Sequence, residues 1–182
     1  MKWLVALGFF ALIAGCKAFD TLDRIIVDPS QAISLHGDTT VTEVARSQRC
    51  KAPDDISRVT LLADRVAVAR WQEQRGVQLQ GNEAIAEAAH ALVDVGQRRS
   101  GGYGLAVTRK AVLHEDGHLY LRATFVEPAE GAAVTQEITS PCVLVKLPKG
   151  RIPFVRVYDQ TDRLRADSAQ PGGVSDFLRW PF

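Results

Sequence analysis

From His90 onward, apolar and polar residues alternate with the period of two that is typical of β-strands. Residues 103–108 and 119–125 place apolar side chains at every second position. Asp116-Gly117, between these two segments, has the composition of a hairpin turn. Three further strands are predicted from apolar runs at residues 91–95, 142–146 and 153–158. The second half of the chain is therefore expected to be mainly antiparallel β-sheet.

The first half of the chain combines strand and helix signals. Two short strands are predicted at residues 39–45 and 58–62. Asp64 is a suitable N-cap for a helix that runs to about Arg75, and Gly76 provides a stop signal. Ala67 and Trp71 lie four residues apart, so we expect them to share the inner face of this helix.

A second short helix is predicted at residues 83–89, with Asn82 as its cap. Antiparallel strands with one or two short helices indicate an α+β fold, and a sandwich with a helical insert is the alternative description. We place a single domain at residues 39–160 and a C-terminal tail at residues 161–182.

The length of 182 residues suits one domain with appendages, and the hydrophobic content of 46% is sufficient for a core. The 22 Lys and Arg residues nearly balance the 21 Asp and Glu residues. No strong electrostatic field therefore favours nucleic acid or acidic lipid, and we expect no nucleic-acid partner.

The N-terminus has the order of a secretory signal, with Lys2 followed by an apolar stretch that is too short to cross a bilayer. Its end, Ile13-Ala14-Gly15-Cys16, resembles a bacterial lipobox. The resemblance implies a signal peptide at residues 1–15 and acyl chains such as palmitate on Cys16, which would anchor the protein stably to a membrane. An ordinary signal peptide with a chance cysteine is the alternative.

The residue after the lipobox bears on the destination of the protein. Lys17 is not the aspartate associated with retention in the inner membrane, so the resemblance favours the outer membrane, facing the periplasm. Residues 16–38 would then form a tether and an early segment before the domain.

Beyond Cys16 the only cysteines are Cys50 and Cys142. An exported protein meets an oxidising compartment, which favours a disulfide between them. Two buried free thiols are the alternative. Two cysteines alone provide too few ligands for a metal site, and we expect no metal and no cofactor.

The glycine-rich stretch at residues 96–104 invites comparison with a phosphate-binding loop. Gly96 and Gly101 have the required spacing, but Gly102 and Tyr103 occupy the positions of the Lys and the Ser or Thr. The following residues alternate like a strand, whereas a phosphate loop leads into a helix. We therefore interpret the glycines as a backbone corner before a strand.

The segment His114-Glu115-Asp116-Gly117-His118 literally matches the His-Glu-x-x-His motif of zinc hydrolases. That motif works on a helix, which brings both histidines to one face. Here it lies between two predicted strands, which favours an exposed hairpin turn. No motif for nucleophilic catalysis is present, and we expect no catalytic residues.

Two turns combine into a pattern that resembles a known family. Ser100-Gly101-Gly102-Tyr103-Gly104 follows one predicted strand, and Thr139-Ser140-Pro141 precedes another that ends in Leu147-Pro148-Lys149. With the hairpin between them, these motifs resemble the C-terminal domain of the protease-complex subunit PrcB family over roughly residues 90–150. Family members often have an aromatic residue after the Ser-Pro, where this chain has Cys142, a departure that fits a disulfide particular to this protein.

The resemblance implies an exported, often lipid-anchored and non-catalytic protein whose namesake associates with a surface protease and supports its stability. The candidate partner-binding residues lie in the two turns and are Gly101, Gly102, Tyr103, Thr139, Ser140 and Pro141. We expect the two turns to lie close together in space. The alternation with Leu105 and Val107 favours a core position for Tyr103, and an exposed recognition residue is the alternative.

These observations lead to the hypothesis of a membrane-anchored envelope lipoprotein that binds and stabilises another envelope protein, with a protease as the candidate. Two alternatives are a zinc-dependent envelope hydrolase that uses residues 114–118 and a structural lipoprotein without a protease partner.

Overall fold

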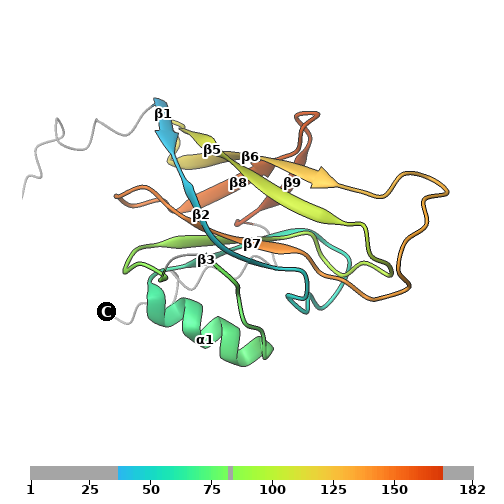
Figure 1. The fold of residues 1–182 in the computed structure, drawn as a ribbon. Coiled ribbons are helices and arrows are strands. Elements are labelled where there is room, and N and C mark those ends of the chain that lie inside the picture. Colours follow the sequence, from blue (N-terminus) through green and yellow to red (C-terminus); the bar gives the residue numbers. More distant parts are fainter. Residues whose placement is uncertain (1–36, 82–83, 170–182) are drawn as a thin grey trace, which may run out of the picture. The chain divides into compact units, whose positions relative to one another are not determined.

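Two β-sheets and one α-helix are formed by the residues that the computed structural model describes, 37–81 and 84–169, within the unit Leu35–Phe182 (Figure 1). In chain order the elements are β1 (Gly37–Thr40), β2 (Thr42–Ser47), β3 (Arg58–Leu62), α1 (Arg65–Arg75), β4 (His90–Asp94), β5 (Gly104–Leu113), β6 (His118–Val126), β7 (Cys142–Lys146), β8 (Phe154–Tyr158) and β9 (Leu164–Asp167). The expected signal peptide, Cys16, most of the tether and residues 170–182 lie outside the described residues.

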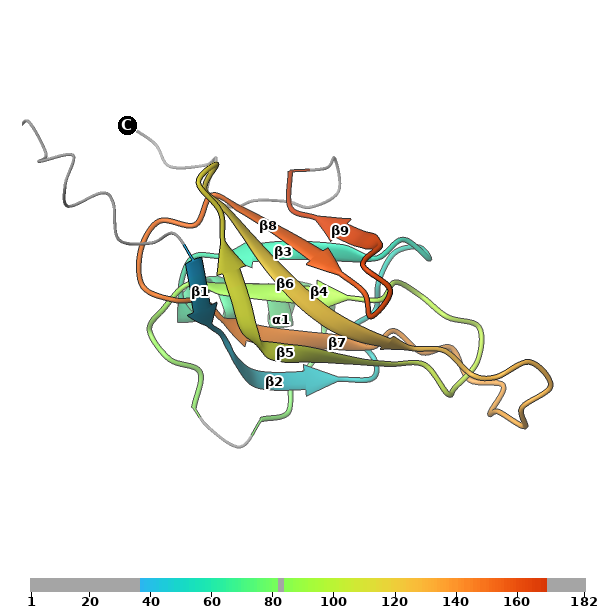
Figure 2. The same ribbon diagram turned by 90° about the horizontal axis from the view of Figure 1, so that it is seen from above.

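The strands are ordered β1-β5-β6-β8-β9 in the first sheet, sheet A, and β2-β7-β4-β3 in the second, sheet B. Every pairing is antiparallel except the parallel pair of β6 and β8. The prediction of a mainly antiparallel β structure with a short helix is therefore confirmed. In Figure 1 the strands of sheet A lie above those of sheet B, and in Figure 2 they lie in front of them.

The main core lies between the two sheets. In β6, four alternate residues point into it, namely Leu119, Leu121, Ala123 and Phe125, which explains the period of two in the sequence. β4 is buried at every position and β7 at all but the last, because sheet B is covered on both faces. Continuous apolar runs are typical of strands in that position.

Helix α1 covers the outer face of sheet B (Figure 1). It begins and ends as the sequence predicts. The Asp64 carboxylate accepts a hydrogen bond from the Ala67 amide at 2.7 Å, and Gly76 closes the helix in the left-handed conformation. Val68 and Trp71 are its buried residues, and they pack in a second apolar cluster against sheet B.

A disulfide between Cys50 and Cys142 is present in this second cluster, with Cα atoms 6.0 Å apart. It connects the chain that follows β2 to the first residue of β7. No helix among the described residues is long and apolar enough to span a membrane.

Three sequence predictions differ from the structure. Residues 84–89 are not helical, because Ile85 packs on the outer cluster and Ala89 on the main core, whereas a helix would turn them to one side. Asn82 and Glu83 lie outside the described residues. The predicted strand at 39–45 is two strands, β1 and β2, on either side of Val41. β9 lies in the segment expected to be a tail, because its pairing with β8 compensates for its few apolar residues.

Candidate partner-binding surface

Three connections meet at one end of the two sheets and form what we call the loop surface: residues 48–57, 95–103 and 127–141. They follow β2, β4 and β6 and lie together on the right of Figures 1 and 2. The glycine-rich stretch and the Thr-Ser-Pro turn both belong to this surface, so the structure brings the two sequence motifs together as expected.

Backbone hydrogen bonds join the two motifs directly. Arg98 and Thr139 exchange a pair of amide-to-carbonyl bonds of 2.8 and 2.9 Å. The Thr139 hydroxyl donates to the Ser100 carbonyl at 2.8 Å, and the Gly101 amide donates to the Thr135 carbonyl at 2.9 Å. The glycine loop is therefore held in a fixed position against the loop that precedes β7.

Ser140 and Pro141 are buried beneath this surface. The Ser140 hydroxyl accepts a hydrogen bond from the Ala52 amide at 3.0 Å, and its carbonyl accepts one from the Cys50 amide at 2.9 Å. The Pro141 carbonyl accepts one from the Val95 amide. These two predicted partner-binding residues thus position the loops and do not offer a contact area of their own.

Two glycines give the loop its shape. Gly96 and Gly102 both have φ of 84°, in the left-handed region that other residues avoid. A side chain on Gly96 would also meet the backbone of Asp55, whose carbonyl carbon lies 2.5 Å from the ideal Cβ position. On Gly102 it would meet only side chains, at 3.1 Å from Pro128 and Val134.

Tyr103 is half-buried and belongs to neither core cluster. β5 begins at Gly104, so Tyr103 precedes the strand and does not follow its alternation into the core as the sequence pattern favoured. The Arg98 guanidinium lies 5.5 Å from the centre of the Tyr103 ring, a distance that permits a cation–π contact.

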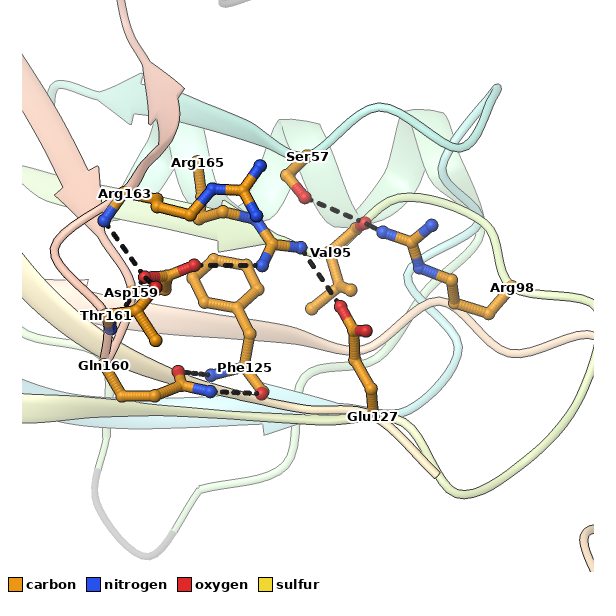
Figure 3. A network of polar contacts seen from close by, with 10 residues as sticks. All are labelled: Ser57, Val95, Arg98, Phe125, Glu127, Asp159, Gln160, Thr161, Arg163 and Arg165. Carbon is orange, nitrogen blue, oxygen red and sulfur yellow. Dashed lines mark hydrogen bonds and ion pairs between the residues drawn. The ribbon is translucent and has the colours of Figure 1, made fainter. Parts of the chain in front are cut away.

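Arg98 is itself held in place by a hydrogen bond from its guanidinium to the backbone (Figure 3). Its guanidinium donates to the Val95 carbonyl at 2.6 Å, and the Ser57 hydroxyl donates to the same oxygen at 3.0 Å. Arg98, which lies beside the Tyr103 ring, therefore has a defined conformation. In the sequence, Arg98 was visible only as one of two adjacent arginines, and nothing indicated this role.

A second polar network lies beside Val95 and Arg98 (Figure 3). Arg165 of β9 lies 3.2 Å from Asp159 and 3.4 Å from Glu127, and its guanidinium is 4.4 Å from the centre of the Phe125 ring. A hydrogen bond from the Thr161 hydroxyl, followed by backbone amides and Arg165, holds the pKa of Asp159 well below its usual range. This network fixes the β8–β9 turn near the loop surface.

The loop surface contains two adjacent hollows that share Gln97. One, of about 510 Å³, is lined by Asp54, Asp55, Gln97, Arg98, Arg99, Ser100 and Tyr103. The other, of about 440 Å³, is lined by Arg49, Lys51, Ala52, Pro53, Gln97, Ile138, Thr139 and Ser140. Ile138 and Ile56 are 62% and 58% exposed on the same loops. Exposed apolar and aromatic side chains among arginines are typical of protein interfaces, although sequence reasoning did not identify either isoleucine.

The His-Glu-x-x-His match forms the hairpin turn between β5 and β6, as the sequence analysis expected. The His114 ring stacks on Tyr120 at 5.3 Å, and the His118 ring stacks on Phe154 at 4.9 Å. His118 Nδ1 also lies 3.0 Å from an Asp116 carboxylate oxygen. Within residues 37–81 and 84–169, no group of three or more His, Cys, Asp or Glu side chains is arranged to hold a metal ion.

Asp94 is a buried carboxyl directly below the glycine loop. It accepts a hydrogen bond from the Gly96 amide at 3.0 Å, and its cross-strand neighbours are Arg58 on β3 and Cys142 on β7. Burial raises the pKa of Asp94 to about 6, although the Gly96 amide and Arg58 act in the opposite direction. The first bond of the loop therefore depends on a group that titrates near neutral pH.

Comparison with known families adds one finding. The family model described as PrcB C-terminal matches residues 91–148. These residues include the two central strands of sheet B, the adjacent strands β5 and β6 of sheet A, and two of the three connections in the loop surface. No curated protein and no solved structure shows a significant match to the chain.

We predict that Gly96→Ala lowers the free energy of unfolding by about 2 kcal/mol or more and that Gly102→Ala lowers it by about 1 kcal/mol. Both changes strain a left-handed residue, but only the first forces a side chain onto backbone atoms. Urea unfolding measures the difference. Gly104→Ala is the control, since its Cβ would make an ordinary 3.5 Å contact with Val126. A cost at Gly96 no larger than that at Gly104 would contradict this account.

We predict that Asp94 contributes a loss of stability as pH rises between about 4 and 6, because folding favours the protonated form of this carboxyl, whose pKa is raised. The loss from this one group is roughly 2–3 kcal/mol. Asp94→Asn keeps an acceptor for the Gly96 amide and removes the charge. The variant should lack this part of the pH dependence and should be more stable than the wild type at about pH 7. Unfolding curves across this range test it, and parallel pH profiles of the two proteins would refute it.

Proposed function

We propose that the protein is a non-catalytic subunit that binds and stabilises a protease of the cell envelope, on the support of the match of residues 91–148 to the PrcB C-terminal family model. The observation that carries the proposal is the extent of the family match. It includes the glycine loop and the Thr-Ser-Pro turn, the two motifs that meet in the loop surface.

The construction of the loop surface supports a role in binding. Its backbone is fixed by paired hydrogen bonds between Arg98 and Thr139, and its exposed residues include Ile56 and Ile138. A surface that is already ordered loses little conformational entropy when a partner docks. Tyr103, half-buried beside Arg98, has the residue type and setting of a central contact in an interface.

We further infer that the two sheets and α1 serve as an α+β, sandwich-like scaffold for these loops. Sites carried on loops depend on a rigid scaffold to position them. Sheet B, covered on both faces and crosslinked by the disulfide, provides such a support.

The proposal places the protein on the membrane through lipid on Cys16, most suitably at the outer membrane facing the periplasm. The support is the lipobox-like Ile13-Ala14-Gly15-Cys16 and the lysine that follows it. Two or more acyl chains suffice for stable anchoring.

Purification of tagged protein from detergent-solubilised envelope tests the binding function. We expect a protease to copurify with the wild type and to decrease about tenfold with Tyr103→Ala, because a central aromatic contact contributes strongly to an interface. The melting temperature of the variant should change by no more than about 2 °C, because Tyr103 lies outside both core clusters.

Tyr120→Ala is the matched control, because Tyr120 is also half-buried but lies on the outer face of sheet A. It should leave copurification intact. Removal of the whole protein should shorten the lifetime of the captured protease. If no protease copurifies with the wild type, or if the protease lifetime is unchanged, the proposal fails.

Cys16→Ser tests the anchor separately. We expect the variant to lack lipid and to leave the membrane fraction, or to accumulate as the unprocessed precursor, since serine lacks the thiol to which the lipid is attached. Mass spectrometry of the mature N-terminus and membrane fractionation provide the readout. A variant that is processed to the wild-type size and stays on the membrane would contradict lipid anchoring.

A further inference from the structure

One strand of sheet A has hydrogen-bonding groups along half of one edge that no described residue satisfies. In β5 the backbone groups alternate between the side that faces β6 and the opposite side. On the opposite side β1 pairs with residues 110–113, and its path ends with the hydrogen bond from the Val41 amide to the Arg109 carbonyl at 2.8 Å. After Val41 the chain leaves sheet A and continues as β2 in sheet B.

The direction of the remaining groups follows from β6. Leu105 lies directly opposite Phe125 in the β5–β6 pair. The Phe125 amide and carbonyl both bond to the Gln160 side chain, at 3.0 and 3.2 Å, so they point away from β5 (Figure 3). Opposed residues in an antiparallel pair either bond to each other or both point away. Leu105 therefore points its amide and carbonyl away from β6, and Val107, two residues on, does the same.

Leu105 and Val107 thus point these groups to the side of β5 that β1 occupies further along the strand, beyond the register shift between Val107 and Ala111. Among residues 37–81 and 84–169, no hydrogen bond is made by the backbone amide or carbonyl of Leu105 or Val107 on this side. In Figure 2, β1 lies beside only the C-terminal half of β5. Within the described part of the chain, these four strand-spaced backbone groups have no hydrogen-bonding partner.

We propose that this edge, residues 104–108 of β5, receives an extended segment of the protein partner as an added strand. The inference rests on the proposed function, and it specifies how part of the partner would bind. Addition of a strand to an exposed sheet edge is a recurrent mode of peptide recognition, in which main-chain bonds give affinity. A segment of about five residues would span the unpaired groups.

The surroundings of the edge fit a strand. On the outer side of the sheet, Gly104 and Ala106 leave room for the side chains of an added strand. On the inner side, Val107 is only half-buried against the core. A hollow of about 320 Å³ further along β5 is lined by β2, Gln80, Gly81 and Arg109.

The edge is continuous with the loop surface, which favours the same partner as its occupant. Gly104 directly follows Tyr103, so a protein that contacts Tyr103 lies beside the open groups. By contrast, the outer edge of sheet B at β2 is partly closed, because Arg46 and Gln80 exchange backbone hydrogen bonds of 2.8 Å.

Val107→Pro tests the proposal, since it removes the outward amide without removing any bond between β5 and β6. Val107→Ala is the matched control, because it shortens the side chain and keeps the amide. Linear peptides are selected on the wild-type protein from a phage-displayed library. We expect them to bind Val107→Ala as they bind the wild type and to bind Val107→Pro at least about tenfold more weakly. Equal binding to Val107→Pro overturns the proposal.

Hydrogen exchange of the wild-type protein provides a second readout that needs no folded variant. With the selected peptide bound, the amides of Leu105 and Val107 should become protected, and unchanged exchange at both overturns the proposal. Sedimentation that shows a dimer dissociated by Val107→Pro would assign the edge to a second copy of the chain and also overturn it.

The experiments distinguish failure of the proposed function from failure of the strand-addition proposal. Peptide binding at the edge without any protease captured from the envelope would leave the edge assignment standing and overturn the proposed function. Capture of the protease that is unchanged in Val107→Pro would overturn the edge assignment and leave the proposed function standing.

Discussion

The passage of the N-terminal strand from one sheet to the other is the constraint on which the rest of the structure depends. β1 pairs with β5 in sheet A, and β2, one residue later, pairs with β7 in sheet B. Val41 at the crossing is buried in the core between the sheets, and its amide makes the last bond to β5. Because one strand serves two sheets, it ties them together and can pair with only part of β5.

The loop surface is also shaped by a constraint on backbone hydrogen bonds. Sheet B is buried on both faces, so the connections that leave it must satisfy their backbone groups at one end of the molecule. Arg98 and Thr139 pair as if they belonged to a short strand, and Ser140 holds the chain around Cys50 and Ala52. The family-matched residues therefore build a rigid support, and they also include the exposed side chain of Ile138.

The way in which the glycine loop is fixed has a cost in stability, which comes from the buried carboxyl of Asp94. Its carboxylate, at the end of the fully buried strand β4, accepts a hydrogen bond from the Gly96 amide at the start of the glycine loop. Burial raises the pKa of this carboxyl to about 6. An apolar residue there would leave the Gly96 amide without a partner, which is unfavourable in a buried position. The loop is thus fixed by a group that destabilises the fold when it ionises.

The sequence by itself determined the features that depend on neighbouring residues. Asp64 and Gly76 bound the helix, Asp116-Gly117 makes the hairpin, and the strand at Arg58–Leu62 has its predicted ends, because capping, turn geometry and side-chain alternation are local. The glycine corner at Gly102 was predictable for the same reason.

Only the tertiary structure decided which residues are buried or exposed at the site. Ser140 is buried because three connections converge on it, and Tyr103 lies outside the core because β5 begins one residue later. β9 forms because β8 offers an edge for pairing, and among the described residues half of one edge of β5 is unpaired because the chain crosses to sheet B at Val41. These outcomes depend on pairing between segments far apart in the chain, which no local pattern encodes.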